Sequence, residues 1–181
     1  MHFKFCPQCG AELNQCPFGD DGFVPWCANC DHPYFDLFPV VTITLVVNEL
    51  GEVALINQKY LSEQYCNFVS GYIKPGESAE ECARREVYEE IGVTVTDLHF
   101  VCSCWDKKQQ MLLAGFIAHG SKTKFALSRE VNAARWVRAE KAIDLVYPEG
   151  NITHTLLEMY LKKQGERGKN AAEENSRTCE S

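Results

Sequence analysis

Runs of apolar and β-branched residues in the middle of the chain predict the strands of a sheet. Residues 40–47 read VVTITLVV, nearly all apolar, which indicates a strand buried on both faces. The polar turn at 48–51 leads into a second apolar run at 52–57, so the two runs are expected to form a hairpin. Further strands are predicted at 111–118 and 134–137.

A period of four residues predicts a helix between Ser78 and Gly92. One face of it would carry the apolar side chains of Ala79, Ala83, Val87 and Ile91. Ser78 followed three positions later by Glu81 is the capping-box pattern of a helix start, and Gly92 is typical of the position after a helix end. A second helix is predicted at 151–163.

Composition divides the chain into three parts. Residues 1–38 are rich in cysteine, glycine, proline and aspartate, and they carry too few apolar residues to form a core unaided. Residues 39–163 hold all the strands and helices predicted so far and are expected to form the main domain. Residues 164–181 contain no aromatic or branched aliphatic residue and are expected to be disordered.

Four cysteines in the N-terminal part have the spacing of a zinc site. Cys6 and Cys9 form one C-x-x-C pair, and Cys27 and Cys30 form another after seventeen intervening residues. Four thiolates complete a tetrahedral Zn²⁺ and leave no position open for substrate, so a structural ion is expected. Cys16 is a possible substitute ligand, but its isolation favours a position outside the site.

Charge and composition narrow the functional class. The formal net charge of -7 argues against a general binder of nucleic acid or of membrane surfaces, and no run of about 18 apolar residues is present. The N-terminus lacks the apolar core of a signal peptide. Ten cysteines without such a signal indicate a reducing compartment, so a cytoplasmic protein is expected.

The predicted helix from Ser78 carries an acidic face. Glu86, Glu89 and Glu90 are spaced i, i+3 and i+4, so they share one side of the helix, where like charges repel. Hard carboxylate oxygens without histidine or thiolate favour Mg²⁺ or Mn²⁺, and such ions would offset the repulsion. The alternative is a solvated acidic face without a bound ion, which the charge pattern alone allows equally well.

The wider pattern around these glutamates favours a metal site over a solvated acidic face. Gly71, Glu77 and the run Arg85-Glu86-Val87-Tyr88-Glu89-Glu90-Ile91-Gly92-Val93 fit every defined position of the Nudix box. The chain therefore resembles a Nudix hydrolase. The resemblance implies an α/β fold, an α/β/α sandwich around a mixed sheet, and a substrate in which a diphosphate links a nucleoside to another group.

The resemblance also implies roles for the residues of the box. Glu86, Glu89 and Glu90 are expected to hold one to three Mg²⁺ or Mn²⁺ ions that bridge the diphosphate and activate water. Arg85 is expected to orient a carboxylate, Glu77, because a guanidinium fork suits a bidentate partner. Which glutamate acts as general base stays open at this point.

A narrower resemblance is to the NADH pyrophosphatase branch, whose members carry a four-cysteine zinc ribbon before the Nudix fold. The segments 30–41, 70–78 and 130–137 are similar to that branch. Its extra glutamate matches Glu130, which is expected either to reach the metal ions or to be a solvated residue paired with a neighbouring arginine. The branch implies a small-molecule nucleotide substrate, first of all NAD(H), and a homodimer; NAD-capped RNA is left open as a substrate.

One segment departs from that branch. Residues 102–112 read CSCWDKKQQML where NAD(H)-cleaving members carry a proline-rich loop that shapes the nucleotide pocket, so ADP-ribose or another nucleoside diphosphate derivative remains an alternative. The other alternative is a non-catalytic nucleotide sensor or a nucleic-acid-binding zinc ribbon. Lys4 is the only basic residue among 1–38, however, and phosphate-backbone binding needs more cations.

Overall fold

The computed structural model describes residues 3–58, 62 and 64–178, with side chains up to residue 166. The chain forms two compact units, Met1–Pro39 and Val40–Ser181. The boundary falls where the composition changes from cysteine-rich and glycine-rich to apolar.

The N-terminal unit is a small antiparallel sheet held around the cysteines. Its strands pair in the order β1-β2-β3, and the C-x-x-C pairs lie in turns near the strand ends. The elements are β1 (Asn14–Pro17), the 3-10 helix η1 (Gly19–Asp21), β2 (Phe23–Cys27) and β3 (His32–Pro33). Only a few of its apolar side chains, such as Val24, are buried, which agrees with the expectation that the unit lacks a core of its own.

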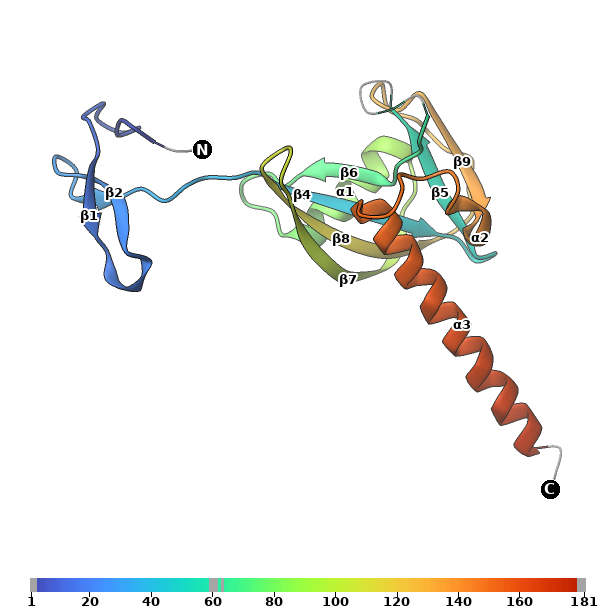
Figure 1. Cartoon of the computed structure of the whole chain (residues 1–181). Coiled ribbons are helices and arrows are strands. Elements are labelled where there is room, and N and C mark those ends of the chain that lie inside the picture. Colours follow the sequence, from blue (N-terminus) through green and yellow to red (C-terminus); the bar gives the residue numbers. More distant parts are fainter. Residues whose placement is uncertain (1–2, 59–61, 63, 179–181) are drawn as a thin grey trace. The chain divides into compact units, whose positions relative to one another are not determined.

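A six-stranded mixed sheet is the centre of the second unit (Figure 1). Five strands lie in the order β7-β8-β4-β5-β9, and β6 pairs with β4. The strands are β4 (Val40–Val47), β5 (Glu52–Asn57), β6 (Val69–Tyr72), β7 (Val95–Asp106), β8 (Met111–Gly120) and β9 (Ala133–Arg138). β4 is parallel to β8 and antiparallel to β5 and β6, so the sheet is mixed as expected.

The helix that carries the acidic residues forms as the sequence predicts. Helix α1 (Ala79–Ile91) begins after Ser78, whose hydroxyl accepts the Glu81 N–H while the Glu81 carboxylate accepts the Ser78 N–H. It ends at Gly92, which adopts a left-handed conformation with φ of 70°. The capping box and the glycine stop are both confirmed.

The two long helices cover opposite faces of the sheet, which gives the α/β/α layers (Figure 1). Val46 and Ile56 pack with Val87 of α1, while Leu45 and Leu55, which point to the other side, pack with residues of α3 (Ile152–Thr178). The short helix α2 (Ala139–Ala142) precedes α3. The expectation of a strand at 40–47 buried on both faces is confirmed.

Two segments differ from the expectation. Cys102–Asp106 belongs to the long strand β7 rather than to a loop; β7 escaped detection because it is an edge strand and mostly exposed, so no apolar pattern marks it. Helix α3 continues to Thr178, whereas disorder was expected from residue 164. The segment 164–178 has little to bury, but its three Glu, two Ala and two Arg favour helix locally. Residues 179–181 lie outside the described part.

No helix within the described residues combines the length and the apolar character that a membrane crossing requires.

Candidate functional site: an acidic cleft and a four-cysteine cluster

Glu86 lies directly against the backbone of Gly71. Gly71 pairs with Thr42 in the β6–β4 ladder and faces α1, and a Cβ atom at this position would overlap the Glu86 carboxylate. The glycine of the box is therefore needed for close approach of a side chain to the strand, and not for a special backbone conformation. Glu86 is held with only 14% of its side chain exposed.

Arg85 connects three carboxylates of the box. Its Nε and Nη2 atoms donate to the two oxygens of Glu77 at 2.9 and 2.6 Å, so the pair expected from the sequence is present. Its Nη1 atom donates to Glu86 at 2.5 Å and to Glu89 at 3.1 Å, two contacts that the sequence did not predict. Hydrogen bonds from Arg85, and then from the Lys74 N–H, lower the pKa of Glu77 to about 2.

Glu90 is the buried carboxylate of the group. Only 3% of the residue is exposed, Oε1 accepts a hydrogen bond from Gln58 at 2.9 Å, and Oε2 has no hydrogen-bond partner among the described residues. Burial raises the pKa of Glu90 to about 8, and the negative charges of Glu86 and Glu130 act in the same direction. A carboxylate in such a place needs a proton or a cation.

The helix carboxylates open into one cleft of about 1110 Å³ in the second unit. Glu86, Glu89 and Glu90 line it together with Glu130, so the structure brings these four predicted residues to one cavity. Lys74 approaches Glu89 to 4.0 Å. Among the described residues, the glutamate oxygens do not form a group as close as that of the four thiols described below, and Arg85 Nη1 donates to both Glu86 and Glu89.

A second wall of the cleft is apolar. It is formed by β4, β8 and the segments around them, with Val41, Ile43, Phe68, Met111, Leu113, Tyr147 and Ile152. The turn between β7 and β8 adds Asp106, Lys108 and Gln109. Asp106 accepts the N–H groups of Lys108 and Gln109 at 2.8 and 2.9 Å, so the turn is ordered by its own side chain. With divalent cations bound at the acidic end, the cleft would suit a ligand that has a phosphate part and a ring.

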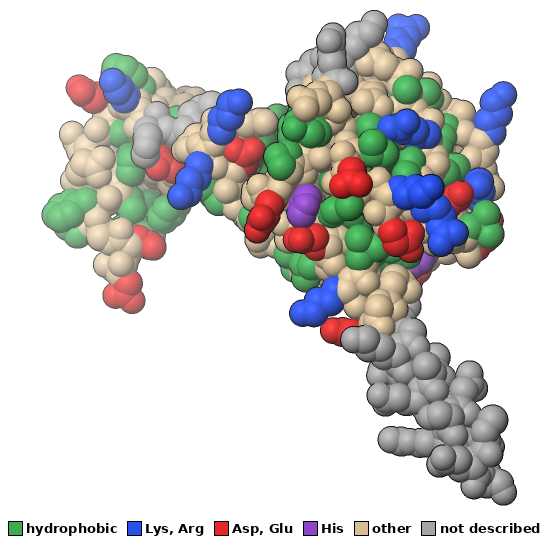
Figure 2. Space-filling model, turned by 45° about the vertical axis from the view of Figure 1, so that its right-hand side comes forward, with side chains coloured by type: hydrophobic (Ala, Val, Ile, Leu, Met, Phe, Trp, Pro, Cys, Tyr) green, Lys and Arg blue, Asp and Glu red, His purple; other side chains and the backbone are tan. Residues whose placement is uncertain are grey.

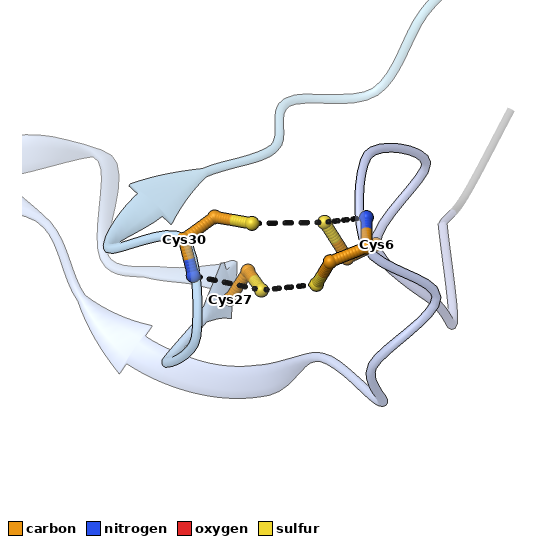
Figure 3. Close-up of side chains that lie close together, drawn as sticks. Cys6, Cys27 and Cys30 are labelled. Carbon is orange, nitrogen blue, oxygen red and sulfur yellow. Dashed lines mark hydrogen bonds between the residues drawn. The ribbon is translucent and has the colours of Figure 1, made fainter.

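The four predicted cysteines of the N-terminal unit lie together (Figure 3). Cys6 Sγ is 3.8 Å from Cys30 Sγ, Cys9 Sγ is 3.5 Å from Cys27 Sγ, and all four sulfurs lie within 4.8 Å of one another. Zn–S bonds of about 2.3 Å in a tetrahedron place the sulfurs about 3.8 Å apart, so the thiols fit zinc. Cys16 is outside the cluster.

Hydrogen bonds at the cluster favour the ionised form of Cys6, whereas the hydrogen bond with Cys9 and burial raise the pKa of Cys30. In each C-x-x-C pair the backbone N–H of the second cysteine donates to the first sulfur at 3.4 Å. The Tyr34 hydroxyl lies 3.1 Å from Cys6 Sγ. Burial opposes ionisation of Cys6, but the hydrogen bonds from Tyr34 and Cys9 outweigh it and lower the pKa of Cys6 to about 6. Thiolate is the form that binds metal.

Comparison with known families agrees with this geometry. The NUDIX domain model matches residues 37–157, which include the whole sheet, α1 and the start of α3. The chain therefore belongs to the Nudix family. Within it the chain is similar to NAD-capped RNA hydrolases, which confirms the resemblance to the zinc-ribbon branch.

Two curated relatives illustrate the similarity. The chain is 28% identical over 181 residues to the NAD-capped RNA hydrolase NUDT12 of Homo sapiens, covering 88% of this chain and 38% of the relative. It is 29% identical over 164 residues to the NAD-capped RNA hydrolase NudC of Pseudomonas putida, covering 89% of this chain and 57% of the relative. The chain thus spans about two fifths to three fifths of the length of these relatives.

Solved structures share the fold. A NUDIX hydrolase from Nitrosomonas europaea superposes with a TM-score of 0.68 and 18% identity, covering 91% of this chain and 93% of that structure. The expected Nudix-type α/β architecture is confirmed by this similarity.

Proposed function

We propose that the chain hydrolyses the diphosphate bond between a nucleoside and another group, with Mg²⁺ or Mn²⁺ held by Glu86, Glu89 and Glu90. The observation that carries this is Glu90, a buried carboxylate beside two further carboxylates in a cleft, of which one oxygen has no hydrogen-bond partner in the part of the chain that the structure describes. Such an arrangement is unfavourable without a cation. Glu130, from the loop before β9, is a further ligand in this proposal.

The side chains of the site have different roles in this proposal. Arg85 holds Glu77 and keeps the Glu86 and Glu89 oxygens at the cleft, so these ligands are ordered before substrate arrives. Divalent ions, when bound, would offset the charge of the diphosphate and lower the pKa of an attacking water. The apolar wall excludes water and packs against the ring of the substrate.

The proposed substrate is NAD(H), cleaved to nicotinamide mononucleotide and AMP. The names of the relatives support it, since both are described as acting on NAD-capped RNA, in which the same diphosphate occurs. NAD-capped RNA is therefore a second substrate to test. Because the turn at Asp106–Gln110 presents Lys108 and Gln109 to the cleft instead of prolines, ADP-ribose or a related nucleoside diphosphate derivative is the alternative small-molecule substrate.

A non-catalytic nucleic-acid module is the weaker candidate. Among the described residues on the face of the second unit drawn in Figure 2, acidic, basic and hydrophobic side chains are interspersed. The N-terminal unit adds Lys4 as its only basic residue. We assign its cysteine cluster to a structural Zn²⁺ and propose, from the branch resemblance, that the protein acts as a homodimer.

A substrate panel with Mn²⁺ tests the proposal. NADH, ADP-ribose and NAD-capped RNA are incubated with the protein, with Glu89→Gln and with Glu80→Gln, and products are separated by chromatography. AMP and nicotinamide mononucleotide should appear from NADH, and Glu89→Gln should reduce kcat/KM by about 10²–10³-fold, the usual size for loss of one stabilising group. Glu80 is exposed on the same helix and outside the cleft, so Glu80→Gln should match wild type.

Two results would count against the proposal. Folded, Mn²⁺-loaded protein that leaves the whole panel intact would exclude the activity. Full activity of Glu89→Gln would exclude the residue assignment while leaving the reaction class in place.

A further inference from the structure

Gln58 makes a buried hydrogen bond behind the acidic group. It follows β5 directly, is 1% exposed, and donates from Nε2 to Glu90 Oε1 at 2.9 Å. Of these two residues only Glu90 lines the cleft, so Gln58 is placed where it meets the carboxylate but not a substrate. No motif of the sequence marks this residue.

The pair leaves two oxygens unsatisfied. Glu90 Oε2 and Gln58 Oε1 are both buried, and neither has a hydrogen-bond partner among the described residues. Native proteins pair nearly all such atoms, so two unpaired acceptors on side chains that are hydrogen-bonded to each other mark a place where a ligand is bound. Both are hard oxygen acceptors, which attract a cation and not an anion.

The amide restricts how the carboxylate can point. Glu90 has two equivalent oxygens; the hydrogen bond from Gln58 holds Oε1, and Oε2 has no hydrogen-bond partner within the described part of the chain. In known metal sites, partners of this kind set the orientation and basicity of the ligand and are nearly as important as the ligand itself.

We infer that Gln58 is a positioning residue for the metal site: by holding Glu90 Oε1 it presents Glu90 Oε2 to the divalent cation. This inference rests on the proposed function, since it needs a cation at the cleft. The competing explanation is that Gln58 only fills space between β5 and α1 and stabilises the fold. If Gln58 is a positioning residue, its effect on cation binding depends on Glu90; if it only stabilises the fold, it does not.

Measurement of Mn²⁺ affinity distinguishes the positioning role from the purely structural role. The affinity of Gln58→Met, which keeps the side-chain length but loses the donor, is measured by electron paramagnetic resonance with Mn²⁺ alone and no substrate. The expected loss is about 10–100-fold, the usual effect of removing such a partner. Thr44→Val is the matched control. Thr44 is 1% exposed, and its hydroxyl has no partner among the residues with described side chains, but it does not line the cleft, so affinity should stay at the wild-type value.

A double-mutant cycle tests the route through Glu90. In a Glu90→Gln background, adding Gln58→Met should change Mn²⁺ affinity by less than about twofold, because the carboxylate that Gln58 positions is gone. The same fold-loss in both backgrounds would show that Gln58 acts independently of Glu90 and would overturn the inference. Circular dichroism melting of each metal-free variant checks folding, and Gln58→Leu replaces Gln58→Met if the latter does not fold.

Two further outcomes distinguish failure of this inference from failure of the proposed function. Wild-type affinity in Gln58→Met would overturn the inference and leave the proposed function standing. Wild-type protein that binds no Mn²⁺ would overturn both.

Discussion

The guanidinium of Arg85 donates hydrogen bonds to both carboxylate oxygens of Glu77, from Nε at 2.9 Å and from Nη2 at 2.6 Å, and its Nη1 atom donates to Glu86. Glu86 and Glu89 follow Arg85 by one and four residues on α1, and Glu77 lies in the loop before the helix. This single side chain therefore ties the loop to the helix and orders the acidic group. Lysine could not replace it, because an ammonium lacks the planar fork.

The pairing makes stability depend on pH in a defined window. The pKa of Glu77 falls from 4.5 to about 2 in the folded protein, so the unfolded chain binds the proton more tightly. The stabilisation by the pair is complete above about pH 4.5 and is lost as the pH falls towards about 2. Urea unfolding of wild type and of Glu77→Gln should show a stability difference at neutral pH that shrinks through this window. A difference that does not vary with pH would contradict the assignment.

Replacement of Gly71 should damage the metal site selectively. In Gly71→Ala the new methyl group would occupy the space of the Glu86 carboxylate, so Glu86 must move away from the cleft. We expect Mn²⁺ affinity to fall by at least about tenfold, measured by electron paramagnetic resonance. The control is Gly165→Ala in α3, where nothing lies within 4 Å of the added atom and binding should not change. Unchanged binding in Gly71→Ala would show that Glu86 is not a ligand.

The cysteine cluster predicts the zinc content. Purified wild type should carry one zinc ion per chain by elemental analysis, because four thiols fit one tetrahedral site. Cys9→Ser should lose the metal and unfold the N-terminal unit, whose folding depends on it. Cys16→Ser should keep full zinc content, since Cys16 lies outside the cluster. Zinc retained by Cys9→Ser, or lost from Cys16→Ser, would contradict the ligand set.

The sequence predicts those strands correctly whose burial requires a run of apolar residues. Strands β4 and β5 were predicted with their observed bounds because both lie inside the sheet and are apolar on both faces. Strand β7 was missed because at the edge of the sheet its exposed positions are free to be polar. Composition also suggested disorder beyond residue 163, although absence of apolar residues excludes only burial and not a helix.

For the candidate site, the motif identified the residues but not their surroundings. The spacing of Glu86, Glu89 and Glu90 predicts a shared helix face, and the cleft contains all three. It does not say which of them is buried; only the fold shows that Glu90 is enclosed. Gln58 is distant in the sequence and belongs to no motif, so its contact with Glu90 depends on how β5 meets α1.

Anomalous diffraction from crystals grown with Mn²⁺ tests the central claim most directly. We expect a manganese peak in the cleft within about 2.0–2.3 Å of carboxylate oxygens of Glu86, Glu89 and Glu90, with Glu90 Oε2 among the ligands. The peak should be absent or weakened in crystals of Glu90→Gln. Well-ordered glutamates with no manganese near them, at a Mn²⁺ concentration that supports hydrolysis, would contradict the account.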